Sequence, residues 1–199
     1  MNGTDTARLE TFSDGVFAIA ATLLILEIRL SGHGTLTHQL LDLWPSYFAY
    51  AVSFVTIGIM WINHHEIFRH IHHVNRTFLV ISVMFLMVIA FIPFPTHVLA
   101  EHLNDDQAQT AAVFYGLTNI AMAAMFTLLW FYAIRGDRLL GPDPDRRAVS
   151  GISRSFRPGI PLYVLATLSA FVSSWLAVVL FGGLALFYVV ESSLFGRDD

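Results

Sequence analysis

Residues 8–30 read RLETFSDGVFAIAATLLILEIRL, and this stretch decides the class of fold. From Gly15 to Leu26 it contains only apolar or small residues, with Asp14 and Glu27 at its two edges. The hydrocarbon core of a bilayer is about 30 Å thick and needs roughly 20 largely apolar residues per crossing. By length alone the apolar part also suits a buried helix of a soluble core, so the rest of the chain must decide.

The composition of the whole chain favours a membrane protein. Of its 199 residues, 55% are hydrophobic and 13% are charged, and the mean hydropathy is +0.62. A soluble domain normally carries about 25% charged residues. The net charge of −4 provides no basic field for nucleic acid, and the absence of cysteine excludes disulfides, thiolate metal ligands and cysteine nucleophiles. We therefore expect an all-α polytopic membrane protein with no nucleic-acid partner.

Six segments are apolar enough to cross a bilayer. They lie at about 8–30, 46–64, 77–99, 110–134, 158–174 and 175–195. The last two share a charge-free stretch, residues 159–190, which would be about 48 Å long as one helix. We predict a hairpin near Ser173-Ser174, with Gly182-Gly183 as the alternative turn. The predicted fold is one domain, residues 1–199, with six transmembrane helices and no soluble domain.

Arginine sets the orientation, because the chain contains no lysine. With the N-terminus inside, only Arg29 falls on the outer side, and the others lie inside: Arg8, Arg69, Arg76, Arg135, Arg138, Arg146, Arg147, Arg154, Arg157 and Arg197. The positive-inside rule then predicts cytosolic N- and C-termini for a multi-pass protein of the cell membrane. The polar start, Met1 to Glu10, has no signal-peptide layout and is expected to stay uncleaved in the cytosol.

Two further features mark the ends of the predicted helices. Residues 136–158 are rich in Arg, Asp, Pro and Gly and are expected to form a cytosolic loop. Trp44, Tyr47, Trp130 and Tyr132 stand at helix ends, where aromatic side chains anchor a helix at the membrane interface.

One face of the first span is set apart by its spacing. At 100° per residue, one stripe contains Arg8, Phe12, Gly15, Ile19, Thr22, Leu23 and Leu26, whereas Ser13 and Asp14 point to other faces. Such a stripe usually means helix packing. However, an ionisable Asp14 inside a membrane helix is costly and usually faces a protein partner or a water path. The small residues around it permit close helix approach, so this helix suits the centre of a bundle.

Three motifs resemble one family. Arg8, Phe12, Ser13 and Asp14 fit the RxxxFSD signature at the start of the first helix of the transmembrane protein 175 family. That family includes a lysosomal potassium channel of animals and shorter six-helix prokaryotic relatives. Trp61-Ile62-Asn63-His64-His65 with Phe68 is similar to its Trp-x-x-His-His segment, and Pro93-Phe94-Pro95-Thr96 resembles the end of its third helix. The chain as a whole resembles a prokaryotic member, with the specific motifs in residues 8–96.

The resemblance implies a homotetramer in which four first helices line a central pathway for potassium, the permeant ion, without a cofactor. By position it puts the main constriction at Ile19, with Leu23 and Leu26 further out, and Thr22 beside Ile19 to tune selectivity. A ring of isoleucines cannot replace an ion's hydration shell, so passage depends on partial dehydration and on wetting of the ring. Potassium holds its water less tightly than sodium, so we expect a passive, leak-type potassium channel with a hydrophobic gate.

The other signature residues are interpreted as structural. We expect the carboxylate of Asp14 to be held by Arg8, by His64 or His65, or by the indole N–H of Trp61, because a buried charge needs partners. Ser13 belongs to the same structural network. Near the outer end of the helix, Glu27 either draws cations electrostatically or pairs with Arg29 or another arginine.

Five histidines crowd the second cytosolic turn: His64, His65, His70, His72 and His73. The remaining four, His33, His38, His97 and His102, fall on the outer side of the membrane, which argues against one shared metal centre. We predict a solvated turn and no metal site, with pH sensing as the second interpretation.

Two other classes of function stay open. In a proton-coupled secondary transporter, Asp14 and the nearby histidines would carry protons; a membrane scaffold would transport nothing. A channel needs the Ile19 stripe to face an axis, whereas a scaffold needs it to face another helix. No Ser-His-Asp arrangement or phosphate-binding loop is present, so no catalytic residue is assigned and no enzyme is expected.

Overall fold

The computed structural model describes residues 3–30, 34–142 and 144–195, and its regular structure is helical. The helices are α1 (Gly3–Leu23), α2 (Leu36–Asp42), α3 (Trp44–His70), α4 (Arg76–Phe91), α5 (Pro93–His102), α6 (Ala108–Ile134), α7 (Arg146–Phe156), α8 (Gly159–Ser169) and α9 (Ser174–Phe195), with 3-10 turns η1 (Leu24–Glu27) and η2 (Arg135–Asp137). Within these residues no strand forms, and one isolated bridge joins Ile71 to Leu140. The all-α prediction is confirmed.

Four helical stretches of the described chain are long and apolar enough to cross a membrane. They are Thr6–Glu27, Trp44–His70, Arg76–His102 and Ala108–Asp137, and they overlap the first four predicted spans. The third of them bends in the middle, because α4 ends at Phe91 and α5 begins at Pro93. A proline ring clashes with the preceding turn and offers no N–H to it, so a straight helix cannot continue through this position.

The fifth predicted span, 158–174, is wrong as a continuous spanning helix. α8 has 11 residues, or about 16 Å at 1.5 Å per residue, which is short of a bilayer core. Pro158 stands just before it and interrupts the chain between α7 and α8. The chain then turns through residues 170–173, so the hairpin near Ser173-Ser174 is confirmed, and Gly182-Gly183 lies inside α9.

The predicted loop at 136–158 contains a helix, α7, which the charge-based interpretation missed. Asp145 caps its first turn, since Oδ1 accepts from the backbone N–H groups of Arg147 at 2.8 Å and Ala148 at 3.2 Å. The prediction that Trp130 anchors a helix at the membrane interface is also wrong, because its side chain is fully buried. Its indole N–H donates to Ser153 Oγ of α7 at 2.9 Å, so Trp130 holds α7 against α6.

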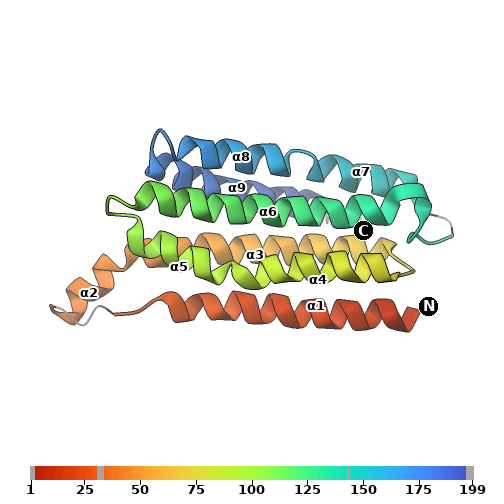
Figure 1. Cartoon of the computed structure of the whole chain (residues 1–199), viewed down its shortest axis with the longest axis horizontal. Coiled ribbons are helices and arrows are strands. Elements are labelled where there is room, and N and C mark those ends of the chain that lie inside the picture. The colour runs from red at the N-terminus through yellow and green to blue at the C-terminus, as the bar shows by residue number, and fades with distance from the viewer. Residues whose placement is uncertain (1–2, 31–33, 143, 196–199) are drawn as a thin grey trace.

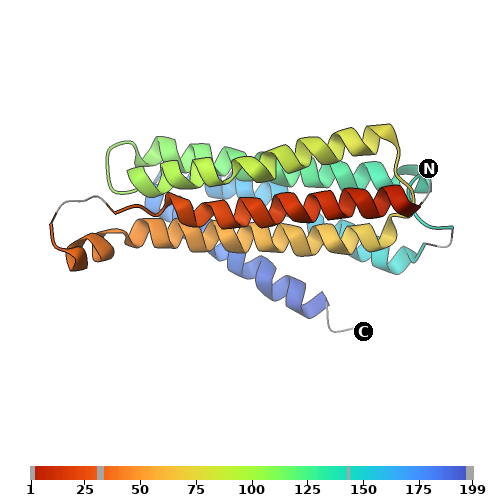
Figure 2. The same cartoon turned by 90° about the horizontal axis from the view of Figure 1, so that it is seen from below.

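The bundle is arranged around α6. In Figure 1, α1 lies along one edge beside α3 and α4, and α8 and α9 lie on the opposite edge beyond α6. Figure 2 shows α1 running across the front of α3 and α4, while α9 crosses the bundle obliquely. The expectation that the first helix occupies the centre of a bundle is therefore wrong within a single chain.

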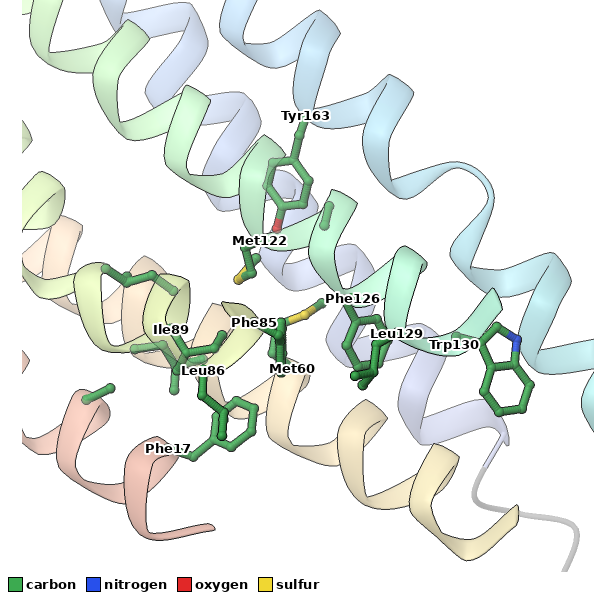
Figure 3. Packing of buried hydrophobic residues seen from close by; sticks show 14 of the residues in the cluster. Phe17, Met60, Phe85, Leu86, Ile89, Met122, Phe126, Leu129, Trp130 and Tyr163 are labelled. Carbon is green, nitrogen blue, oxygen red and sulfur yellow. The ribbon is translucent and has the colours of Figure 1, made fainter. Parts of the chain in front are cut away.

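The core between these helices is apolar and aromatic. Figure 3 shows side chains from α1, α3, α4 and α6 meeting in one cluster: Phe17, Met60, Phe85, Leu86, Ile89, Met122, Phe126 and Leu129. Burial of this cluster joins α1 to the rest of the bundle on one side only.

A chain of hydroxyl groups crosses the bundle at the end that contains α5 and joins three helices. The Thr96 hydroxyl donates to the Ile92 carbonyl at 2.8 Å, so its oxygen accepts from Ser53, also at 2.8 Å. Ser53 in turn accepts from the Tyr115 hydroxyl at 3.0 Å. Every member is buried, and each hydroxyl proton has an acceptor, which avoids the cost of an unpaired polar group inside the membrane.

Gly116 lets α6 approach α8 and α9 closely. A Cβ atom at this position would overlap the side chain of Thr167 and lie 2.9 Å from Cζ of Phe181. We predict that Gly116→Ala lowers stability by about 1–3 kcal/mol, because overpacking forces neighbouring helices apart. Thermal unfolding of the purified protein in detergent measures the loss.

Gly183→Ala is the matched control, since a Cβ atom there has nothing within 4 Å. This control should unfold at the wild-type temperature or slightly above it, because alanine favours helix over glycine. An unfolding temperature for Gly116→Ala that equals that of the control would contradict the close approach.

Candidate ion-conducting face of the first helix

Helix α1 has two faces with opposite surroundings. Its inner face is covered by α3 and α4, and the covered residues are Leu9, Ser13, Phe17, Ala20 and, in η1, Leu24. Their spacing of three or four residues places them on one side of the helix. Everything on the other side of α1 is left uncovered by its own chain.

The uncovered side is the predicted stripe. Its large apolar members are 57% exposed at Phe12, 61% at Ile19, 41% at Leu23 and 60% at Leu26, and Arg8, Gly15 and Thr22 are exposed as well. The apolar stripe of α1 therefore does not pack against its own bundle. Figure 2 shows α1 nearest the viewer, in front of the rest of its own bundle. A face of this kind needs lipid, another subunit or a water-filled axis against it.

Thr22 presents an oxygen on this uncovered side. Its hydroxyl proton is used within the helix, because Oγ1 lies 2.8 Å from the Ala18 carbonyl and 2.9 Å from the Ile19 carbonyl. The hydroxyl oxygen keeps its remaining lone pairs and is therefore an acceptor toward the outside of the helix. An oxygen acceptor one turn from Ile19 suits a partly dehydrated cation.

Two polar contacts attach the inner end of α1 to α3. The indole N–H of Trp61 donates to Asp14 Oδ1 at 2.8 Å, which is one of the partners predicted for this carboxylate. One turn earlier, Glu10 Oε1 lies 3.3 Å from Nδ1 of His65. Arg8 remains on the exposed stripe. The indole contact carries the more specific geometry, because Trp offers one donor in a fixed direction.

Ser13 and His64 lie behind these contacts, inside the bundle. The Ser13 hydroxyl is buried and donates to the Leu9 carbonyl of the preceding turn at 2.8 Å. His64 is 1% exposed, and its ring stacks on Phe68 with a centroid distance of 4.2 Å. Within the described residues its two ring nitrogens find no hydrogen-bond partner. His64 therefore acts here as a flat ring in an aromatic cluster and not as a ligand of Asp14.

The η1 turn that follows α1 is tied to α5 by Glu27. Its carboxylate lies 3.2 Å from Nδ1 of His97, whose Nε2 lies 3.4 Å from Glu101. The predicted pairing of Glu27 with an arginine is therefore not what the structure shows, and the partner is a histidine 70 residues further along the chain. Sequence spacing could not reveal this contact, because it depends on the bend at Pro93 that brings α5 beside η1.

The histidine-rich turn makes local contacts. His70 Nε2 lies 3.5 Å from Glu66, and the backbone N–H groups of His72 and His73 donate to the Leu139 carbonyl. Among the described residues, no three histidine or acidic side chains are grouped closely enough to hold a metal ion. The turn contributes to packing between the two loops at this end of the bundle.

The bundle and the uncovered stripe define a helical membrane protein whose first helix presents an apolar face beyond its own subunit. The model of the family described as "Endosomal/lysosomal potassium channel TMEM175" matches residues 8–93. A potassium channel of Chamaesiphon minutus is 42% identical over 95% of this chain and 96% of its own. One of Streptomyces collinus is 45% identical over 92% of this chain and 91% of its own. The chain belongs to the TMEM175 family.

The comparison extends to a solved structure and to animal proteins. A crystal structure of a lysosomal potassium-selective channel TMEM175 homolog from Chamaesiphon minutus superposes with a TM-score of 0.88, at 40% identity, covering 95% of this chain and 98% of that one. The endosomal/lysosomal proton channel TMEM175 of Gallus gallus is 33% identical over 66% of this chain but only 28% of its own. The family and these relatives are ion channels and not enzymes.

The contact between Trp61 and Asp14 generates a prediction about stability. Asp14→Ala and Trp61→Phe each remove the same hydrogen bond, and each should lower stability by about 1 kcal/mol, because both side chains are partly exposed. Thermal unfolding and the yield of assembled protein measure the effect. The permeability ratio of the remaining assembled protein should stay at the wild-type value.

The double variant is the internal control. It should lose no more stability than the larger single loss, because the second change has no bond left to break. Normal assembly of Asp14→Ala with a changed permeability ratio would mean that Asp14 contacts the permeating ion.

Proposed function

We propose that this protein is a potassium channel that conducts passively through a central pore of a homotetramer. Four copies of α1 line the pore, with Ile19 as the main constriction, Leu23 and Leu26 further out, and Thr22 beside the constriction. The carrying observation is the exposure of this stripe, which its own bundle leaves uncovered along the whole length of α1. The bacterial relatives described above as potassium channels support potassium as the permeant ion.

The chemistry of the stripe suits selection by dehydration. The side chains of Ile19 and Leu23 offer no oxygen to replace the water of an ion, so an ion passes the ring only with a reduced hydration shell. The ion that gives up water more readily passes more easily, and that ion is potassium rather than sodium. A small inward movement of the same ring excludes water, so the constriction also serves as a hydrophobic gate.

The topology belongs to the same proposal. The chain crosses the cell membrane six times, with α8 forming the membrane part of the fifth crossing, α7 continuing it at the cytosolic surface, and α9 forming the sixth crossing. Both termini lie in the cytosol, because the end of the bundle that carries the start of α1 also carries nearly all of the arginines. The pore then runs from Arg8 at the cytosolic end to Leu26 and Glu27 at the outer end.

A proton-coupled transporter is the second candidate, and one observation favours it. His64 is buried one helix away from Asp14 with both ring nitrogens unpartnered inside the described chain, and a buried imidazole of this kind suits proton transfer. The Gallus gallus relative is named a proton channel, which also points to protons. The two candidates differ in which ion gradient drives the current.

The reversal potential of the reconstituted protein tests the function directly. With potassium on one side of a planar bilayer and sodium on the other, the current should reverse on the potassium-selective side. A pH difference imposed without an alkali-cation gradient should drive little current. A reversal that follows the pH difference would replace the channel proposal by the proton-coupled one, and reconstituted protein without current under any gradient would favour the scaffold.

Ile19→Asn tests the constriction. An asparagine ring hydrates the narrow point, so conductance should rise and the preference for potassium over sodium should fall. Lowering the dehydration barrier by about 1.4 kcal/mol corresponds to roughly a tenfold rise in current. Single-channel conductance and the reversal potential measure the two effects.

Leu165→Asn is the matched control for this variant. Leu165 is 62% exposed, close to the 61% of Ile19, but it belongs to α8 on the opposite edge of the bundle from α1 (Figure 1). Its conductance should equal that of the wild type. Unchanged currents in Ile19→Asn, or an equal change in both variants, would remove Ile19 from the pore.

A further inference from the structure

Helix α7 is held against the bundle in one rotational setting. Its inner side carries Val149, Ser153 and Phe156, of which Ser153 accepts the hydrogen bond from the Trp130 indole at 2.9 Å. The ring of Phe156 packs edge-on against Phe126 with a centroid distance of 4.8 Å. These contacts with α6 prevent α7 from turning about its axis, so its exposed side has a defined direction.

The exposed side next to these contacts is basic. Arg147, Ser150, Arg154 and Arg157 follow one another at spacings of three, four and three residues, and all four are exposed. This spacing places them along one side of a helix. The backbone at Arg157 keeps helical angles, so the row continues one residue beyond α7. We call these four residues the arginine row.

The arginine row has no acidic partner inside the part of the chain that the structure describes. The two nearest described acids are engaged elsewhere. Asp137 forms a two-armed ion pair with Arg146, at 2.8 and 2.6 Å, and Asp145 accepts backbone N–H groups at the start of α7. Three guanidinium groups on a fixed helix thus lack counter-charges from the described part of their own chain.

The position of α7 brings this row to the level of lipid headgroups. α7 lies beside the last turns of α6, where Phe126 and Trp130 contact it, at the end of the bundle where α1 begins (Figure 1). It continues nearly in line with α8, so it stands at the periphery of the bundle on the edge opposite α1. A basic helix immediately beside membrane-spanning segments attracts anionic headgroups.

We propose that the arginine row is a binding site for the phosphate groups of anionic phospholipids in the cytoplasmic leaflet. Guanidinium groups bind phosphate oxygens in pairs of parallel hydrogen bonds, and Ser150 adds a hydroxyl donor between two of them. Only the choice of leaflet rests on the orientation in the proposed function. The lipid site itself goes beyond it and stands whether the protein conducts potassium, protons or nothing.

Lipid retention by the purified full-length protein tests the site. Wild-type protein in mild detergent is mixed with phosphatidylglycerol or, separately, phosphatidylcholine, and bound lipids are counted by native mass spectrometry. Phosphatidylglycerol should be retained in preference to phosphatidylcholine. Arg147→Gln and Arg154→Gln should each weaken its retention by about fivefold, because each basic residue at a membrane surface contributes roughly one such factor.

Arg146→Gln is the matched control, since it removes the same charge from the same helix, but Arg146 already has a counter-charge in Asp137. It should retain phosphatidylglycerol at the wild-type level. An equal loss in Arg146→Gln and Arg154→Gln, or equal retention of both lipids by the wild type, would overturn the site. Inorganic phosphate at millimolar concentration should compete weakly; full displacement of the lipid by it would mean a site for free phosphate instead.

Correct folding of the variants is checked by their unfolding temperature in phosphatidylcholine, which should match that of the wild type. The same measurement distinguishes this proposal from the proposed function. If the wild type shows no preference for phosphatidylglycerol but its reversal potential favours potassium, only the lipid-site proposal is contradicted. If it carries no potassium current but keeps its lipid preference, only the channel proposal is contradicted.

Discussion

The Trp61 indole donates to Asp14 at 2.8 Å, and together with buried Ser13 and Phe17 this contact determines which side of α1 its own bundle covers. A helix inside a bilayer has no hydrophobic force that orients it, because lipid chains are as apolar as leucine. Polar contacts and close packing must do so instead. With Asp14 directed to α3, the helix has one rotational setting, and the stripe through Ile19 is left facing away.

The same logic governs the rest of the bundle. Polar groups within the membrane-spanning part must be satisfied internally, and the chain from Tyr115 through Ser53 to Thr96 does this across three helices. Close approach at Gly116 and the aromatic cluster around Phe85 supply the packing contacts. His64 departs from this pattern, since its nitrogens are buried without partners in the described chain, and this makes it the strongest structural argument for proton movement. Hydrogen bonds and close packing thus fix the arrangement of the helices on the side of the bundle away from the stripe of α1.

The sequence predicted the helical class, the first four spans and the hairpin before α9 because these depend on local hydropathy and on turn-forming residues. It failed at α7, where arginine and serine residues lower the average hydropathy although Val149, Ile152 and Phe156 recur at helical spacing. It also overestimated α8, because hydropathy does not register that the helix ends at Ser169 and the apolar chain turns through residues 170–173. Trp130 was assigned to the interface from its place near a helix end, and its burial follows from the docking of α7, which no local pattern reveals.

What the sequence by itself determined is the set of residues on each face of α1, since helical spacing alone puts Ile19, Leu23 and Leu26 on one side. Only the tertiary structure decided which side is covered, because that depends on Trp61 from a distant helix meeting Asp14. The partner of Glu27 was decided in the same way, since the bend at Pro93 carries His97 to it. Helical periodicity determines which residues share a side of one helix, whereas contacts between different helices depend on how the whole bundle packs.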